Sequence, residues 1–211
     1  MPEPFHLPRL YAIVDVICFA PPLRTMSSIV EFAWDLGEGG VTLLQYRNKD
    51  GDTRLMLHHA REIKRVLEGK ATLIMNDRAD LCVAAGYDGV HLGQDDLPAE
   101  GARLVVGDDR IVGVSTHNTE QVKEAEASPA DYIAIGPVFP TTGKKNPDAL
   151  VGLEGVRAAR AATSKPLVAI GGITRSNAKS VIEAGADSVA VISGLLSSPR
   201  KMAEEFLRLL V

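Results

Sequence analysis

The sequence predicts one (β/α)8 barrel spanning residues 1–211, and three observations carry the prediction. Eight short apolar runs alternate with segments of helical spacing. The runs are nearly continuous in Val, Ile and Ala, as in parallel strands that are covered on both faces. The length suits a single barrel, and with 45% hydrophobic residues the chain can bury a large core.

The eight expected strands are short apolar runs. In chain order they read LYAIVD (10–15), VTLLQYR (41–47), ATLIMND (71–77), GVHLGQ (89–94), RIVGVS (110–115), DYIAIGP (131–137), PLVAIGG (166–172) and SVAVIS (188–193). An open doubly wound sheet is the alternative fold. No GxGxxG follows the first run, which argues against that alternative.

Three of the intervening segments show clear helical spacing. They follow Ser27 and Ser28 (candidate N-caps), Thr174, and Ser198 with Pro199. Their apolar faces comprise Ile29, Phe32, Ala33 and Leu36; Ala178, Val181 and Ile182; and Met202, Phe206, Leu209 and Leu210.

A turn recurs before three of the strands, in GYDGVHLG, PADYIAIG and GADSVAVI. Asp88, Asp131 and Asp187 therefore begin strands. In a barrel the chemistry lies at the opposite, carboxyl ends of the strands. We interpret these three acids as turn residues.

Composition narrows the classes of molecule that the protein is expected to bind. The formal charge of −4 and pI of about 5.7 come without a basic stripe, which argues against nucleic acid and acidic membrane surfaces. No signal peptide and no bilayer-length apolar run is recognisable, so we expect a cytoplasmic protein with small-molecule substrates, and a homo-oligomer is compatible with the sequence. Cys18 and Cys82 lack metal-site spacing and are expected to be free thiols, Cys82 in the core.

Polar side chains in phase follow the second strand. Gln45, Arg47 and Lys49 are spaced by two, so on an extended chain they point the same way. One amide and two cations on one side suit a multiply charged anion such as a diphosphate. The alternative is an ordinary solvated strand end.

Acids end the third and fourth strands. Asp77 follows Asn76, and either Asp95 or Asp96 occupies the next junction. Neighbouring parallel strands lie about 4.8 Å apart, so two carboxylates can face one point. Mg²⁺ binds one or two carboxylates together with phosphate oxygens and water. The alternative is that these acids cap the helices that follow.

The remaining strand ends also carry polar groups. Ser115 and His117 follow the fifth strand, whereas His91 lies within the fourth and is interpreted as a hydrogen-bonded core residue. No triad signature accompanies Ser115, so it is not predicted to be a nucleophile. The sixth strand leads into the longest connection, PVFPTTGKKNPDALVG, where an active-site loop and a solvated surface loop are equally compatible.

A second anion site is expected after the seventh and eighth strands. Gly171 and Gly172 permit close backbone approach, and Ser193 with Gly194 supplies the other half. In barrels these two loops often bind a phosphate with backbone N–H groups.

Taken in order, LYAIVD, LLQYRNK, MNDRADL, GVHLGQDD, GVSTHN, ADYIAIGPVFPTTGKK and VAIGGITRSN…EAGADSVAVISGL closely resemble the thiamine-phosphate synthase family over nearly the whole chain. The resemblance implies a transferase of thiamine biosynthesis that joins hydroxymethylpyrimidine diphosphate to hydroxyethylthiazole phosphate and releases diphosphate. It implies a dissociative, Mg²⁺-assisted substitution, in which the protein cations stabilise the leaving group and no protein nucleophile is needed.

By motif, the resemblance assigns three groups of residues. Gln45, Arg47, Lys49, Asn76, Ser115 and Lys144 are assigned to the pyrimidine diphosphate, with Arg47, Lys49, Ser115 and Lys144 as the catalytic groups. Thr141, Thr142, Gly143, Gly172, Ile192 and Ser193 are assigned to the thiazole phosphate. Asp77 and Asp96 are assigned to Mg²⁺, which decides for Asp96 over Asp95.

The sequence departs from the family pattern at Gly143, where a second hydroxyl is common, and at Ser188, where GADGV is common. Two other activities on the same barrel are weighed: a thiazole tautomerase and a non-catalytic phosphate-binding regulator. Relatives of the first kind typically lack the paired acids, and a regulator does not need them. A sugar-phosphate isomerase needs a general base, but here the best carboxylates are assigned to metal.

Overall fold

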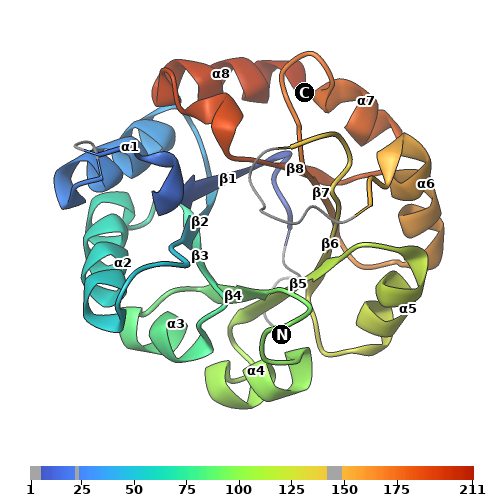
Figure 1. Ribbon diagram of the computed structural model, residues 1–211, viewed down its shortest axis with the longest axis horizontal. Helices are drawn as coiled ribbons and strands as arrows, with labels where there is room; N and C mark the ends of the chain where they lie inside the picture. Colours follow the sequence, from blue (N-terminus) through green and yellow to red (C-terminus); the bar gives the residue numbers. More distant parts are fainter. Residues whose placement is uncertain (1–5, 22–23, 142–148) are drawn as a thin grey trace.

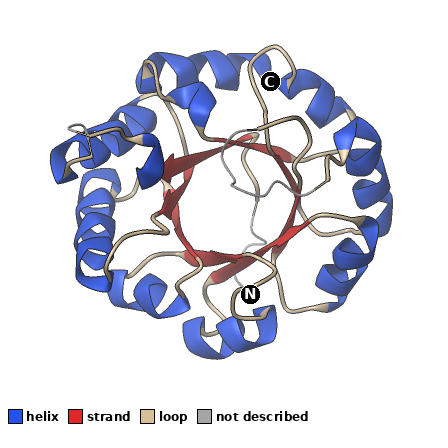
Figure 2. Cartoon of the chain, viewed as in Figure 1, coloured by secondary structure: helices blue, strands red, loops and turns tan. Residues whose placement is uncertain are grey.

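In a computed structural model the chain forms a closed barrel of eight parallel strands in the order β1 to β8, surrounded by a ring of helices (Figure 1). The structure describes residues 6–21, 24–141 and 149–211. Figure 2 shows the strands as an inner ring and the helices outside it. The predicted (β/α)8 class is confirmed.

The strands match the eight predicted runs. They are β1 Leu10–Asp15, β2 Leu43–Arg47, β3 Thr72–Asn76, β4 Gly89–Leu92, β5 Ile111–Thr116, β6 Tyr132–Ile135, β7 Leu167–Ile170 and β8 Ser188–Val191. The helices are α1 Met26–Glu38, α2 Thr53–Leu67, α3 Ala79–Ala85, α4 Ala99–Val106, α5 Thr119–Ala127, α6 Gly152–Ala162, α7 Ala178–Glu183 and α8 Pro199–Leu209. Two 3-10 turns, η1 Val16–Cys18 and η2 Ser193–Leu195, follow β1 and β8.

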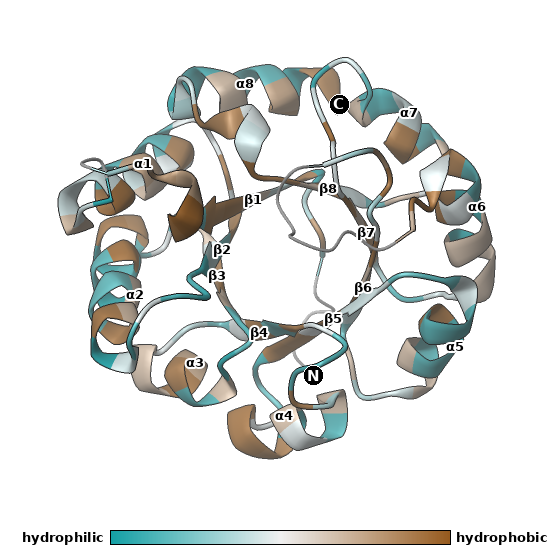
Figure 3. Cartoon of the chain, viewed as in Figure 1, coloured by the Kyte–Doolittle hydropathy of each residue, from teal (hydrophilic) through white to brown (hydrophobic). Residues whose placement is uncertain are grey.

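Two apolar layers hold the barrel together. The larger lies between strands and helices and includes Leu44, Tyr46 and Val90. The smaller fills the barrel interior and includes Tyr11, Ile74 and Tyr132. Most helices are apolar toward the strands and more polar outward, whereas α4 exposes Leu104 and Val105 (Figure 3). Alternate residues of each strand thus enter different layers, which explains why the runs are apolar without a period of two.

The helix starts differ from the predicted ones at α1. Thr25 is its N-cap, and the Thr25 hydroxyl accepts the N–H of Ser28. The prediction of Ser27 or Ser28 as N-cap is wrong, because the capping hydroxyl lies one position before Met26. Ser198 and Pro199 do begin α8, and of its predicted apolar face Met202, Phe206 and Leu210 are buried whereas Leu209 is exposed.

The three turn acids tie strand pairs together at the amino end of the barrel. One carboxylate oxygen of Asp88 accepts the N–H of Leu73, and the equivalent bonds join Asp131 to Val112 and Asp187 to Leu167. The bonds are 2.7–2.8 Å long. Each acid lies just before an even-numbered strand, as predicted, and in addition it binds the start of the preceding odd-numbered strand.

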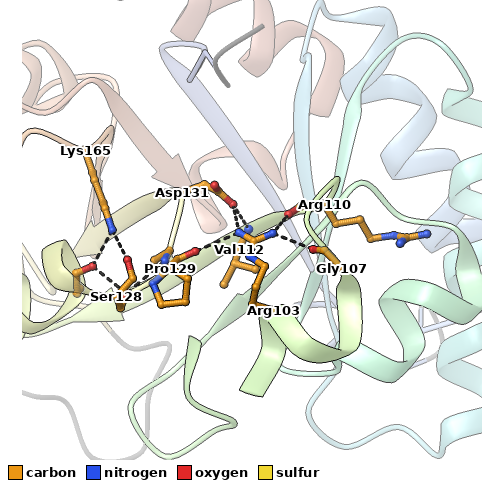
Figure 4. A network of polar contacts seen from close by, with 10 residues as sticks. Arg103, Gly107, Arg110, Val112, Ser128, Pro129, Asp131 and Lys165 are labelled. Atoms are coloured by element: carbon orange, nitrogen blue, oxygen red, sulfur yellow. Dashed lines mark hydrogen bonds and ion pairs between the residues drawn. The ribbon is translucent and has the colours of Figure 1, made fainter. Parts of the chain in front are cut away.

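Arginines complete two of these contacts. Arg103 on α4 pairs with Asp131 at 2.6 Å and also donates to the carbonyl oxygens of Gly107 and Pro129 (Figure 4). Arg160 on α6 pairs with Asp187 at 2.9 Å. Backbone carbonyls that end helices and loops are thus satisfied by the same side chains that hold the acids.

The cysteines are unpaired, with Cys82 buried and Cys18 exposed in η1. Among the described helices, none is long and apolar enough to cross a membrane.

Replacing Asp131 with alanine should lower the free energy of unfolding by about 1–3 kcal/mol, because the Val112 N–H and the Arg103 guanidinium lose their acceptor together. Urea denaturation measures this. Asp108→Ala is the matched control, since Asp108 is an exposed acid in the turn before β5. Equal stability of the two variants would contradict the role given to Asp131.

Candidate active site

Charged groups line the carboxyl ends of β1 and β2. The register pairs Asp15 with Arg47, and the Arg47 Nη1 donates to the Asp15 carboxylate. Asp15 is 4% exposed, so this is a nearly buried ion pair. The pair fixes the guanidinium, whose remaining N–H groups can bind an anion.

Gln45 lies deeper in the barrel than Arg47. Its side chain is buried, and its Nε2 donates to the Tyr11 hydroxyl at 2.8 Å. Gln45 and Arg47 share the inner face of β2, as their spacing predicts, whereas Tyr46 between them packs outward. Lys49 lies beyond the strand end and is half exposed.

Asp77 and Asp96 meet at the ends of β3 and β4. Their carboxyl groups lie within hydrogen-bonding reach of each other, and the Lys49 Nζ lies 3.2 Å from the Asp77 Oδ2. The Gly93 N–H donates to the Asp96 Oδ2 at 2.8 Å. Asp95 is exposed, so the structure brings Asp96, the acid chosen by resemblance, toward Asp77.

Neither acid of this pair caps a helix. The N-caps of α3 and α4 are Arg78 and Pro98, and neither makes a side-chain capping bond. Asp77 has a φ of 62°, inside a tight turn where the Arg78 N–H donates to the Asn76 carbonyl. A non-glycine residue in this region is strained, and such strain concentrates at functional sites.

Close approach of the two acids changes the pKa of Asp77. Burial and the neighbouring Asp96 raise it to about 6, against the opposing effect of Lys49. Two carboxylates held together in a half-buried place repel each other when both are ionised. A divalent cation removes that repulsion, so the pair fits one.

The donor set suits Mg²⁺ in particular. Two oxygen ligands leave room for phosphate oxygens and water. Among the described residues no group of three or more His, Cys, Asp or Glu side chains gathers, as a structural zinc site would require.

Ser115 is partly buried and lies against His91. The His91 Nε2 lies 2.8 Å from the Ser115 Oγ, and the His91 Nδ1 lies 2.8 Å from the Tyr132 hydroxyl. Burial lowers the pKa of His91 to about 4. With a tyrosine where a triad has a carboxylate, and with a weakly basic ring, the pair is poorly suited to make Ser115 a nucleophile.

Asn76 and His117 occupy places close to these groups. Asn76 is buried at the end of β3, in register with His91. The His117 Nδ1 lies 2.6 Å from the carbonyl oxygen of Gly136, which joins the ends of β5 and β6.

The residues predicted to form the second anion site lie at the ends of β7 and β8. Gly171 and Gly172 have φ values of 104° and 64°. A Cβ on Gly172 would lie 2.5 Å from the Pro140 carbonyl oxygen, so the loop after β6 packs directly on it. Thr141 follows Pro140 at once, and Ile192 with Ser193 leads from β8 into η2.

Three predicted residues, Thr142, Gly143 and Lys144, lie outside the described residues. Three others were missed: Asp15, Tyr11 and Tyr132 join the predicted groups by hydrogen bonds or an ion pair. Asp15 ends the first predicted strand, a position at which an acid could have been noticed. The tyrosines lie inside strands, where sequence spacing alone indicates only core.

Fold and strand-end groups together define the class of protein as a (β/α)8-barrel enzyme. The sequence pattern of the family described as thiamine monophosphate synthase (TMP-TENI) matches residues 10–195. The chain belongs to that family.

Individual relatives support the same family assignment. A thiamine-phosphate synthase of Koribacter versatilis is 60% identical over 210 residues, covering 100% of this chain and 99% of the relative. One of Chloroflexus aurantiacus is 44% identical, covering 90% and 86%. The solved thiamine phosphate pyrophosphorylase of Pyrococcus furiosus is 35% identical, with a TM-score of 0.83 and coverage of 96% and 95%.

The buried His91 predicts a specific acid sensitivity. Its pKa is about 4 when folded against 6.5 when free, so between these pH values the unfolded state binds more protons and stability falls as pH falls. Lowering the pH from 7.5 to 5 should therefore lower the free energy of unfolding by about 2 kcal/mol. Urea denaturation at both pH values should show a smaller loss in His91→Gln. An equal loss in both proteins would contradict a buried neutral His91.

Proposed function

We propose that this enzyme condenses 4-amino-2-methyl-5-(diphosphooxymethyl)pyrimidine with 4-methyl-5-(2-phosphooxyethyl)thiazole, giving thiamine phosphate and diphosphate. The observation that carries the proposal is the Asp77–Asp96 pair with Lys49 against it, next in the barrel to Arg47. Two acids and two cations at adjoining strand ends suit a metal-bound diphosphate better than a single phosphate.

Mg²⁺ is the cofactor we propose, held by Asp77 and Asp96, and when bound it would neutralise charge on the leaving diphosphate. Arg47 and Lys49 add positive charge at the same edge. Asp15 fixes the Arg47 guanidinium, so this guanidinium is preorganised to stabilise the charge that develops on the leaving oxygen. Lys144 is assigned to the same group by resemblance.

The pyrimidine ring is assigned to the interior side of this site. Gln45 and Asn76 are buried at the ends of β2 and β3, where amide groups can orient a heterocycle by hydrogen bonds. The thiazole phosphate is assigned to Thr141, Gly172, Ile192 and Ser193, with Thr142 and Gly143 in the same loop. The two substrates then meet over the barrel mouth.

The reaction we propose needs positioning more than protein chemistry. The bond from the methylene carbon to the diphosphate oxygen breaks with its electron pair leaving on oxygen. The aminopyrimidine stabilises the cation, and the thiazole nitrogen attacks it. Ser115 would contact the diphosphate as a hydrogen-bond donor, which agrees with its poor suitability as a nucleophile.

Alanine at Asp77 or at Asp96 should lower kcat at least about a hundredfold with the fold retained, because the leaving group loses its metal. Product formation from both substrates measures this, and circular dichroism checks the fold. Asp95→Ala is the matched control and should stay within about twofold of wild type, since Asp95 is exposed. Near-normal rates in either acid variant would make the metal assignment wrong.

The wild-type protein should form thiamine phosphate and diphosphate with Mg²⁺, should lose this activity with a chelator, and should regain it when Mg²⁺ is added in excess. Chromatography of the two products measures the activity under each of these conditions. A folded protein that forms no product with both substrates and Mg²⁺ would contradict the proposed function. In that case a tautomerase or a phosphate-binding regulator would be tested next.

A further inference from the structure

A chain of four hydrogen bonds crosses the barrel interior from Gln45 to Ser115. Gln45 donates to Tyr11 at 2.8 Å, and the Tyr11 and Tyr132 hydroxyls lie 3.0 Å apart. Tyr132 and His91 follow at 2.8 Å, and His91 and Ser115 at 2.8 Å. Both ends of the chain are residues assigned to the diphosphate substrate, while its three middle members are buried.

The barrel makes room for this chain at one glycine. A Cβ on Gly113 would lie 2.0 Å from the Tyr132 Cζ. The Tyr132 ring therefore lies across β5 and reaches His91 on β4, where the two rings stack at 5.5 Å. Any larger residue at position 113 would displace the ring. The three atoms nearest to that Cβ position all belong to the Tyr132 side chain, so the absence of a side chain at Gly113 makes room for the tyrosine ring.

The protons of such a chain must point one way. A tyrosine hydroxyl and a neutral imidazole each carry a single proton that can be donated within the chain. A ring nitrogen that accepts a hydrogen bond carries no proton, so an imidazole that accepts at Nδ1 carries its single proton on Nε2. Since Tyr11 accepts from Gln45, it gives its own proton to Tyr132; otherwise that buried proton would have no acceptor among the described residues. Tyr132 then donates to the His91 Nδ1, which leaves the proton of the ring on Nε2.

The far end of the chain decides what Ser115 can do. When the His91 Nε2 donates to the Ser115 Oγ, the serine proton points away from His91 and is available to an acceptor. If the chain ran the other way, Ser115 would donate to His91 and offer only lone pairs. A diphosphate oxygen is an acceptor, so only the first direction suits it.

We infer that Tyr11, Tyr132 and His91 are positioning residues that act through Ser115, and that they fix the Nε2–H tautomer of His91 so that Ser115 donates to the diphosphate. This inference rests on the proposed function for the contact between Ser115 and the diphosphate. None of the three side chains needs to touch the substrate to exert this effect.

The tautomer is directly measurable in the ligand-free protein. With histidine labelled by ¹⁵N in the ring, the His91 resonances are identified by their loss in His91→Gln. At pH 7.5 the Nε2 should carry the proton and the Nδ1 should not. In Tyr132→Phe the Nδ1 loses its donor, and the ring should populate both tautomers. A protonated Nδ1 in the wild-type protein would overturn the inference.

Binding of inorganic diphosphate with excess Mg²⁺, measured by calorimetry, tests the link to Ser115. Ser115→Ala should raise Kd about tenfold, the effect of one hydrogen bond to a charged group. Tyr132→Phe should raise Kd about threefold to tenfold. The double variant should bind no more weakly than Ser115→Ala, because the two residues act through one bond. Additive effects would overturn the inference.

Tyr46→Phe is the matched control. The Tyr46 hydroxyl also lies 2.8 Å from a histidine Nδ1, that of His59, but this pair lies in the layer between strands and helices. The control should lose stability as Tyr132→Phe does and should keep the wild-type Kd. If Tyr132→Phe does not fold, Tyr11→Phe replaces it, with a smaller shift of the tautomer in the same direction.

Failure of this inference differs from failure of the proposed function. The tautomer and the diphosphate Kd need no turnover, whereas the synthase assay of the wild-type protein needs no variant. Normal synthesis with a wild-type Kd in Tyr132→Phe would overturn the inference alone. Absent synthesis with the predicted tautomer and Kd values would overturn the proposed function alone.

Discussion

Pairing of β1 with β8 closes the sheet, and the functional groups depend on that closure. A closed parallel ladder brings every strand end to the same rim and points alternate side chains into one interior. Asp15, Arg47 and Asn76 become neighbours although they are separated by about thirty residues each along the chain. In an open sheet the groups of β1 and β8 would lie at opposite edges.

The aspartates at the two ends of the barrel play different roles. At the amino end, Asp88, Asp131 and Asp187 each bind a strand N–H, so their charges are used to hold strand pairs. At the carboxyl end, Asp77 and Asp96 face each other at the expense of mutual repulsion, seen in the raised pKa of Asp77. Acids of the same type thus stabilise one end and store electrostatic and backbone strain at the other.

Between the ends lies an interior that is unusually polar for a packed core. Hydrophobic residues such as Ile74 and Val168 share it with two tyrosines, a histidine and a glutamine. Each of these polar groups has a partner in the chain from Gln45 to Ser115, which removes most of the cost of burying them. A fully bonded chain is also rigid, and it connects the packing of the core to the groups at the rim.

The sequence by itself determined the eight strands, the barrel class and the division of the acids by strand polarity, because hydrophobic period and the order of elements are local properties. It also placed Arg47, Lys49 and Asp77 at strand ends. It did not reveal the Asp15–Arg47 pair or the path through Tyr11 and Tyr132, since a tyrosine within an apolar run looks like core. Only the tertiary structure decided these points, because hydrogen-bond partners across a barrel depend on register and on the room left by Gly113, and neither is a property of one segment.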